Sequence, residues 1–284
     1  MKIANSKDRP VEVSVRYLGQ FGFLFNFDGL SVAVDPYLTD SVDRIPGLPP
    51  GMFVRNYPPP VALSALSHLD LVLGTHDHMD HADPETLTGI AKAAPGCHFA
   101  GPRLSTRIME RVPIPRTQIT VLNEGTPFRF QELMIEPVAA SHEDYESDAE
   151  GFHRFLGYLL HWRGITLYHS GDTISTPRLF ESLKTHAIDI GFLPINGRSA
   201  HRRKFDIIGN MDSAEAVQFA GWLAARKGFN LLVPTHYDLY TSNGAPVAEF
   251  VEAWDKAPEP KPGIKLFRPG EEIVYRKPAG DGGL

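Results

Sequence analysis

Histidine and aspartate crowd one short stretch of the sequence. Residues 76–81, His-Asp-His-Met-Asp-His, place three imidazoles and two carboxylates directly after the apolar run 70–75. No apolar periodicity accounts for these histidines as packing residues, and burying so many polar groups without partners would be costly. Imidazole and carboxylate groups bind zinc, manganese or iron, and a hydrolytic site also keeps one position open for water. The stretch therefore predicts a catalytic metal site in a loop after a strand.

This loop alone cannot complete two metal sites, so further ligands must come from other parts of the chain. Three candidates stand directly after apolar segments that are typical of strands: His142, Asp172 and His236. In a layered α/β enzyme the loops at the strand ends gather at one edge and carry the ligands. We therefore expect these three side chains to join the loop 76–81.

The stretch 76–81 resembles the HxHxDH signature of the metallo-β-lactamase superfamily. The resemblance implies an α/β fold, the αββα sandwich, in which two mixed sheets face each other with helices outside. It also implies two divalent metal ions, manganese or zinc, with iron as an alternative. The ligands that it implies are His76, His78 and His142 for the first ion, Asp80, His81 and His236 for the second, and Asp172 as a bridge between them.

A two-metal centre of this kind implies a mechanism. Ions roughly 3.5–4 Å apart would lower the pKa of a shared water and polarise the scissile carbonyl or phosphoryl oxygen, so that a metal-bound hydroxide is the nucleophile. Asp172 and Asp80 are the expected catalytic residues, Asp80 by orienting the water or moving a proton to the leaving group. The sequence has no Gly-x-Ser-x-Gly elbow that would indicate a serine nucleophile instead.

Further passages resemble the L-ascorbate-6-phosphate lactonase (UlaG-like) branch of the superfamily. They are residues 56–60 (Asn-Tyr-Pro-Pro-Pro), 194–198 (Pro-Ile-Asn-Gly-Arg), 208–211 (Ile-Gly-Asn-Met) and 233–238 (Val-Pro-Thr-His-Tyr-Asp). This likeness implies a lactonase that acts on a small anionic, phosphorylated sugar-like substrate. The substrate-binding residues expected from these passages are Asn196, Arg198, Asn210 and Tyr237.

The loop 196–204 concentrates positive charge in a protein that is acidic as a whole. We expect Arg198 to face the metal cleft, where its guanidinium could hold a phosphate or carboxylate with two hydrogen bonds. Arg202, Arg203 and Lys204 are interpreted as part of a solvated surface or a subunit contact.

Two other functions stay open at this point. One is a metal-dependent phosphodiesterase, phospholipase D-like or cyclic-nucleotide-like, and the other is a non-catalytic metal-binding or nucleic-acid-processing protein. The remaining histidines lack paired ligands in the sequence, and most are interpreted as surface or core residues: His68, His98, His161, His186 and His201. For His153 and His169 a place near the metal site stays an alternative.

The elements that must position these groups follow from apolar patterns. Strands are predicted at 11–34 (a meander that turns at Asp28-Gly29), 70–75, 133–138, 157–162, 165–169, 188–193 and 231–233. Helices are predicted to begin after Asp83, with Gly96 closing the first, after Thr176, and after Asp212 with Glu215 completing a capping box. Six prolines make 41–60 an irregular loop, a candidate lid or subunit contact.

Composition limits the class of protein. The 284 residues, 42% hydrophobic and 22% charged, are expected to form one domain over 1–284. A net charge of −6 argues against a surface built for nucleic acid. The N-terminal residues lack a signal-peptide core, and no stretch approaches the roughly 18 apolar residues of a membrane span. Cys97 is the single cysteine, which excludes an intrachain disulfide. We expect a cytoplasmic homo-oligomer that binds a small molecule and neither nucleic acid nor a membrane.

Overall fold

The computed structural model describes residues 11–277, and within this range two seven-stranded mixed sheets face each other. The first sheet has the order β14-β1-β2-β3-β4-β5-β6. Its strands are β1 (Glu12–Gly19), β2 (Gly22–Phe27), β3 (Leu30–Val34), β4 (Leu71–Leu73), β5 (His98–Gly101), β6 (Ile119–Val121) and β14 (Glu272–Arg276).

The second sheet has the order β13-β12-β11-β10-β9-β8-β7. Its strands are β7 (Phe128–Phe130), β8 (Leu133–Ala139), β9 (Leu156–Trp162), β10 (Ile165–His169), β11 (Ile188–Pro194), β12 (Phe229–Thr235) and β13 (Gly263–Ile264). In both sheets antiparallel pairs at one side give way to parallel pairs at the other. The parallel pairs matter for the site because they carry several strand ends to one edge.

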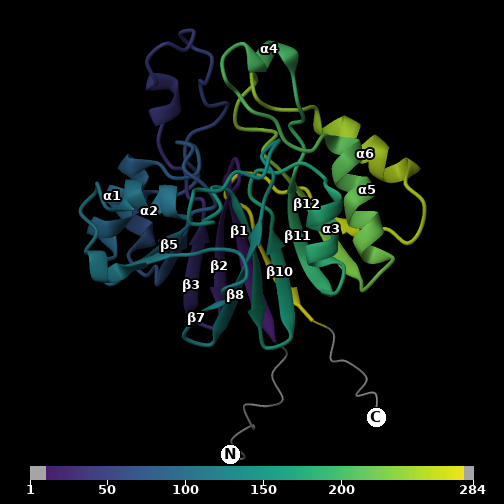
Figure 1. Ribbon diagram of the computed structural model, residues 1–284, viewed down its shortest axis with the longest axis horizontal. Helices are drawn as coiled ribbons and strands as arrows, with labels where there is room; N and C mark the ends of the chain where they lie inside the picture. The colour runs from purple at the N-terminus through teal and green to yellow at the C-terminus, as the bar shows by residue number, and fades with distance from the viewer. Residues whose placement is uncertain (1–10, 278–284) are drawn as a thin grey trace, which may run out of the picture.

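Helices cover the outer face of each sheet, as Figure 1 shows. Helices α1 (Pro84–Ala93) and α2 (Arg103–Met109) lie on the first sheet, and α3 (Pro177–Leu183), α5 (Ser213–Ala224) and α6 (Val247–Lys256) lie on the second. The short helix α4 (Ala200–Arg203) stands beyond the ends of the strands. This arrangement confirms the predicted αββα sandwich.

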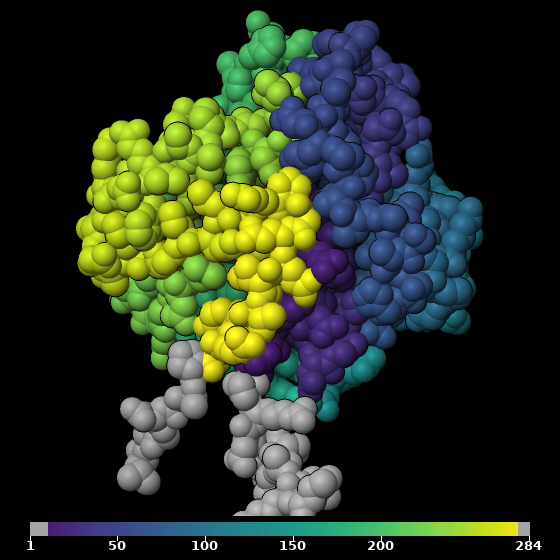
Figure 2. Space-filling model, turned by 180° about the vertical axis from the view of Figure 1, so that it is seen from behind, coloured from purple at the N-terminus to yellow at the C-terminus, as the bar shows by residue number. Residues whose placement is uncertain are grey.

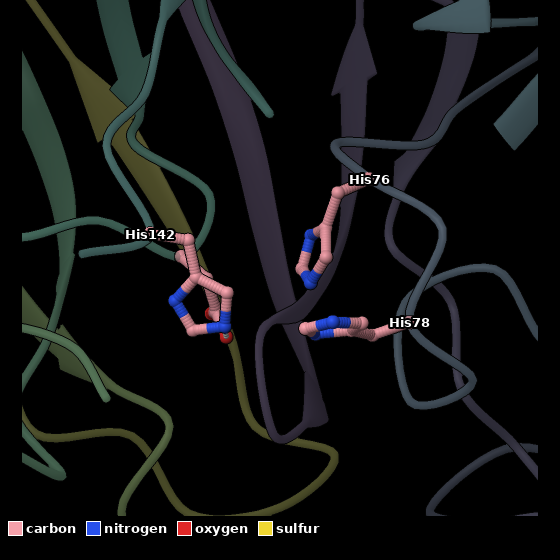
Figure 3. A group of neighbouring side chains, drawn as sticks. His76, His78 and His142 are labelled. Atoms are coloured by element: carbon pink, nitrogen blue, oxygen red, sulfur yellow. Dashed lines mark ion pairs between the residues drawn. The ribbon is translucent and has the colours of Figure 1, made fainter. Parts of the chain in front are cut away.

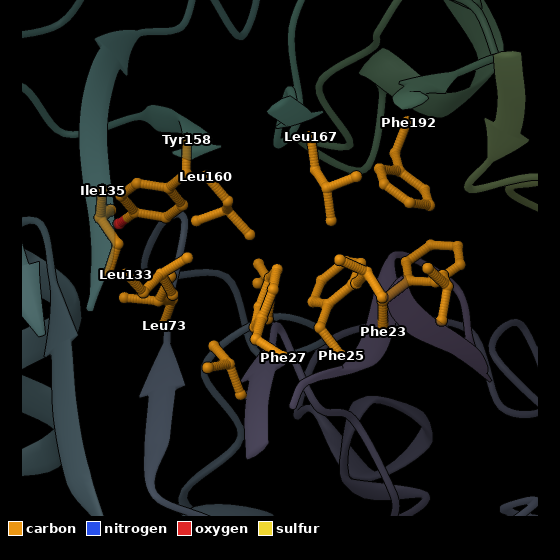
Figure 4. Close-up of a cluster of buried hydrophobic side chains, with 14 of the residues drawn as sticks. Phe23, Phe25, Phe27, Leu73, Leu133, Ile135, Tyr158, Leu160, Leu167 and Phe192 are labelled. Carbon is orange, nitrogen blue, oxygen red and sulfur yellow. The ribbon is translucent and has the colours of Figure 1, made fainter. Parts of the chain in front are cut away.

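The main core lies between the two sheets and draws side chains from both. Phe23, Phe25 and Phe27 from β2 meet Leu160 and Phe192 from the second sheet, and Figure 4 shows these rings and aliphatic groups facing each other. The alternation of buried residues along β1 and β2 places every second side chain in this layer. Each fully buried aliphatic or aromatic side chain contributes about 1.5–3 kcal/mol of burial free energy, so this layer holds the sheets at a fixed separation.

Most predicted elements are confirmed. The meander turns at Asp28-Gly29, the hairpin β9–β10 turns at 163–164, and the capping box of Asp212 and Glu215 is present at the start of α5. Asp83 caps α1 by accepting hydrogen bonds from the amides of Glu85 and Thr86. The sequence did not predict the short strands β5, β6, β7 and β13, the strand β14, or the helices α2, α4 and α6.

The proline-rich segment 41–60 is an ordered loop that begins with a 3-10 helix, Ser41–Arg44. It lies beyond the same edge of the sandwich as α4 (Figure 1). The back view in Figure 2 shows these two regions side by side over the body of the molecule. Within residues 11–277, none of the helices combines the length and the apolar character that a membrane crossing requires. The predicted absence of a signal peptide concerns residues 1–10, which lie outside the described range.

Candidate metal centre

The ends of four strands bring the predicted ligands together. The loop 76–81 follows β4, His142 follows β8, Asp172 follows β10 and His236 follows β12. Because these strands end at the same edge of the sandwich, Asp80 and His236, more than 150 residues apart in the sequence, become neighbours. Figure 3 shows His76 and His78 from one half of the molecule pointing toward His142 from the other half.

The side chains form two groups with ligand spacing. In the first group, ligand atoms of His76, His78, His142 and Asp172 all lie within 4.8 Å of one another, and in the second the same holds for Asp80, His81 and His236. This division matches the two sets that the family resemblance implied.

Asp172 lies between the two groups. Its Oδ1 atom is 3.5 Å from Nε2 of His81, and its Oδ2 atom is 3.7 Å from Nε2 of His142 and 3.3 Å from Nε2 of His236. One carboxylate oxygen therefore approaches ligands of both groups, which is the position that a bridging ligand needs.

Several polar atoms in this cluster are buried without a hydrogen-bond partner among the described residues. They include Nε2 of His76, Nε2 of His81 and Oδ1 of Asp172. An unpaired buried polar atom costs about 1–3 kcal/mol, and a folded protein rarely keeps several together without compensation. Divalent cations would pair with all three atoms, so the residues present fit a metal centre.

The charges of the cluster also fit metal binding. Burial lowers the pKa of His142 to about 3 and holds the pKa of His76 well below its usual 6.5, so both rings are neutral, the form that binds a metal. Burial opposes ionisation of Asp172, but His236 and His81 outweigh it and hold the pKa of this carboxyl well below 3.8. In His81 and His236 burial lowers the pKa, but Asp172 and Asp80 outweigh it and raise the pKa above 6.5. The site thus combines neutral imidazoles at His76 and His142 with an ionised carboxylate, and metal binding would displace a proton from His81 and from His236.

Asp35 is a supporting residue that the sequence analysis missed. It follows β3, is completely buried, and its Oδ2 atom accepts a hydrogen bond of 2.8 Å from Nδ1 of His81. The amide and hydroxyl of Thr75 donate to the same carboxylate at 2.7 and 2.6 Å. This network fixes the His81 ring so that Nε2 points into the cluster. Asp35 stands directly after the apolar strand 30–34, and a polar residue in that position is the same signal that identified the candidate ligands.

Gln20 is a second supporting residue, and no sequence signal pointed to it. Its Nε2 atom donates to Oδ2 of Asp80 at 2.7 Å and lies 3.3 Å from Nε2 of His236. The loop 76–81 is held from its other side by Arg154, whose guanidinium makes two hydrogen bonds, of 2.8 and 3.2 Å, to Asp77. Asp77 therefore positions the loop and belongs to neither ligand group.

A cavity of about 240 Å³ opens over the cluster. The groups at its base are His78, Asp80, His142, Asp172 and His236, and the other lining residues are Val42, Ile45, Leu48, Phe53, Met79, Phe205, Asp206, Ile207, Ile208 and Asn243. Ligand sites commonly measure about 300–1,000 Å³, so this cavity suits a small molecule. The loop 41–60 supplies four of the lining residues, which gives the segment a place in the site.

The four residues expected to bind substrate lie elsewhere. None of Asn196, Arg198, Asn210 and Tyr237 is among the cavity-lining residues of the described chain. Arg198 is an exposed residue that pairs with the Glu215 carboxylate and donates to the backbone oxygen of Asn210 at 3.3 Å. The expectation that Arg198 faces the metal cleft is therefore wrong, because the start of α5 engages its guanidinium. Asn196 and Asn210 are buried and bond to each other at 3.0 Å.

The neighbouring Arg202 also departs from its interpretation as a solvated residue. It is only 8% exposed and donates hydrogen bonds to Oδ1 of Asn243 and to the backbone oxygens of Asn196 and Gly197. Arg203 is exposed, as expected, and pairs with Glu143.

The remaining histidines stand apart from the two ligand groups. His153 lies 3.5 Å from Glu124, and His169 is a core residue whose Nε2 bonds to the backbone oxygen of Phe21 at 2.8 Å. His161 and His186 lie beside Glu136, at 3.4 and 3.8 Å, in a partly exposed group with ligand-like spacing.

Comparison with known proteins agrees with this geometry. The family model described as a β-lactamase superfamily domain matches residues 14–236, most of the chain. The chain belongs to the metallo-β-lactamase superfamily. A metallo hydrolase from Ignicoccus hospitalis has the same fold, with a TM-score of 0.70 at 21% identity over 94% of this chain and 100% of that one. With this family and these ligands, the chain is a metal-dependent hydrolase of the metallo-β-lactamase fold.

Two relatives with different names illustrate the likeness. A UPF0173 metal-dependent hydrolase from Thermococcus kodakarensis is 27% identical over 92% of this chain and 99% of its own length. A probable L-ascorbate-6-phosphate lactonase UlaG from Escherichia fergusonii is 25% identical over 72% of this chain, and the match spans 59% of the lactonase. The likeness to the lactonase is therefore partial.

Proposed function

We propose that this superfamily member is a lactonase-type hydrolase. It would hydrolyse the ester bond of a small carboxylic ester, either a lactone or a linear ester. The observation that carries the proposal is the cavity of about 240 Å³ whose base is formed by ligands of both groups. A substrate in that cavity would lie with its carbonyl group against the metal ligands. The partial likeness to a probable UlaG lactonase supports the choice of a carboxylic ester.

Divalent cations bound by the two groups would supply an activated water and polarise the carbonyl oxygen. The protein supplies position and charge. Asp172, 3% exposed, holds its carboxylate between the two groups, and Asp35 and Gln20 fix His81 and Asp80 in place. The side chain of Asp80 keeps 17% of its surface exposed at the cavity, so it can accept the proton that the attacking water loses and pass it to the leaving alkoxide.

The test is hydrolysis of a panel of lactones, aryl esters and a phosphodiester by the metal-loaded protein, with Asp172→Ala as the variant. We expect turnover of lactones or esters by the wild type, and its loss in Asp172→Ala with an unchanged circular dichroism spectrum. Wild-type turnover in the variant would contradict the role of Asp172. Turnover of the phosphodiester alone would replace the lactonase proposal with the phosphodiesterase alternative.

A further inference from the structure

We propose that the part of the substrate outside the reacting bond is uncharged and apolar, a short alkyl or aryl group. This inference rests on the hydrolase function proposed above and names its substrate class. The observation is the composition of the cavity wall beyond the metal ligands. Eight of its side chains are apolar: Val42, Ile45, Leu48, Phe53, Met79, Phe205, Ile207 and Ile208.

Two segments from opposite halves of the chain build this wall. Val42, Ile45, Leu48 and Phe53 belong to the loop 41–60, and the others except Met79 belong to residues 205–208, directly after α4. Both segments stand beyond the edge of the sandwich where the ligands lie (Figure 1). The apolar wall therefore covers the metal centre and is the first surface that a substrate meets.

The loop 41–60 is packed in place. Val42 and Phe53 belong to one apolar cluster with Tyr37, Leu239 and Tyr240, and Ile45, Leu48, Met79 and Ile207 pack against it. At its far end, the side chain of Asn56 donates to the backbone oxygen of Asp238 at 2.8 Å. A wall fixed in this way can select by shape, because its side chains do not need to be ordered on binding.

The cavity lacks the charges that an anionic group would need. Among the residues that the structure describes, no lysine or arginine lines it, and the one charged side chain beside the metal ligands is the carboxylate of Asp206. A phosphate on the distal part of a substrate would lose its hydration, find no cation and meet Asp206. Burial of an unpaired charge costs several kcal/mol, so the wall disfavours such a substrate.

Arginines that stand near the wall segments in the sequence are engaged with the protein itself. Arg198 pairs with Glu215, and Arg203 pairs with Glu143. Arg44 pairs with Asp40 and Glu85. Recruiting any of them to a substrate would break an existing ion pair.

Asn243 is the neutral polar residue on the wall. Its Oδ1 atom accepts a hydrogen bond of 3.1 Å from Asn196 and another from the buried Arg202. Since arginine only donates, the oxygen must face Arg202, and the Nδ2 donor lies on the other side of the amide. Asn243 can therefore donate to an uncharged substrate oxygen, which adds orientation without a requirement for charge.

The experiment compares γ-lactones that carry alkyl chains of increasing length with 6-phosphogluconolactone, using wild-type protein of measured metal content. Each methylene buried against the wall should raise kcat/KM about fourfold, until the cavity is filled. The phosphorylated lactone should be the poorest substrate. Equal rates along the alkyl series, or a preference for the phosphorylated lactone, would overturn the inference.

A binding measurement separates this inference from the proposed function. The affinity of the metal-loaded protein for alkanoates from acetate to octanoate is measured by calorimetry and does not depend on turnover. If no ester is hydrolysed but affinity still rises with chain length, the lactonase proposal fails and the apolar wall stands. If esters are hydrolysed but affinity is independent of chain length, the inference fails and the lactonase proposal stands.

The matched variants are Ile207→Asp on the wall and Val54→Asp on the loop 41–60. Ile207 lines the cavity and is partly exposed, whereas Val54 is 57% exposed and is not among the lining residues. We expect Ile207→Asp to flatten the dependence on chain length and Val54→Asp to leave it unchanged. An equal effect of both substitutions would assign the change to the added negative charge and contradict a role for the wall.

Discussion

At the scale of single residues, the candidate metal centre depends on groups that belong to neither ligand group. The His81 ring is held by Asp35, which is itself held by two hydrogen bonds from Thr75. Asp80 is held by Gln20. An imidazole whose orientation is fixed in advance loses less freedom when it binds a cation, so these contacts raise the affinity of the site.

Asp35→Asn should lower metal affinity about 10- to 100-fold, because the amide is a weaker acceptor for Nδ1 of His81. Competition with a chromogenic chelator measures this effect. The control is Asp189→Asn, since Asp189 is also a buried carboxylate but accepts from Thr166 and Tyr275, away from the ligand groups. Equal losses of affinity in both variants would show that the effect comes from general destabilisation.

His142→Ala should lose metal and activity, whereas His153→Ala should keep both. His142 is a member of the first ligand group, while His153 lies beside Glu124 outside either group. Elemental analysis and turnover of the two purified variants decide the matter. Retention of full metal content by His142→Ala, together with its loss in His153→Ala, would reverse the assignment.

At the scale of elements, four strands that end at the same edge of the sandwich position the candidate ligands, and sharp turns follow two strand ends beside them. Asp35 and His236 follow β3 and β12 with φ of 46° and 58°, a left-handed conformation that is uncommon outside glycine. Backbone hydrogen bonds of 2.9 Å hold both turns, from Asp35 to Leu73 and from His236 to Gln20. The strain is local and is compensated by the sheets on either side.

Helix α5 packs against β11 and β12, which lead into the site, and its start depends on a capping box. Asp212→Ala should reduce the free energy of unfolding by about 0.5–2 kcal/mol, because the side chain caps the amide of Glu215. Urea unfolding measures the change. Asp255→Ala, a substitution near the end of α6 that removes no cap, should change stability by about 0.5 kcal/mol or less. A neutral Asp212→Ala would contradict the contribution of the cap.

At the scale of the whole molecule, each ligand group joins the two halves of the sandwich. His76 and His78 come from the loop after β4 in the first sheet, and His142 and Asp172 follow strands of the second. The second group likewise combines the loop 76–81 with His236. A cation in either group would link the two sheets at one edge, in addition to the apolar layer between them.

Metal removal by a chelator should therefore lower the melting temperature, and restoring the metal should raise it. A metal that binds the folded state and not the unfolded state adds about 2.7 kcal/mol to the free energy of unfolding at a free metal concentration of 100 times Kd. Differential scanning calorimetry measures the shift. The His142→Ala variant is the control and should show a smaller shift under the same conditions. A melting temperature that does not respond to metal in the wild type would contradict the link between the halves.

The sequence by itself indicated the candidate ligands and the fold class, because both leave local marks. Histidines and aspartates directly after apolar runs are visible in one dimension, and so are the turn at Asp28-Gly29 and the capping box of Asp212. Short strands such as β6 and β7 have three residues each, too few to show a period, so they escaped prediction.

Only the tertiary structure decided which charges meet. It paired Arg198 with Glu215, buried Arg202 beside Asn243, and brought the loop 41–60 over the ligands opposite residues 205–208. Contacts of this kind join distant segments through packing, and no local pattern in a sequence encodes them.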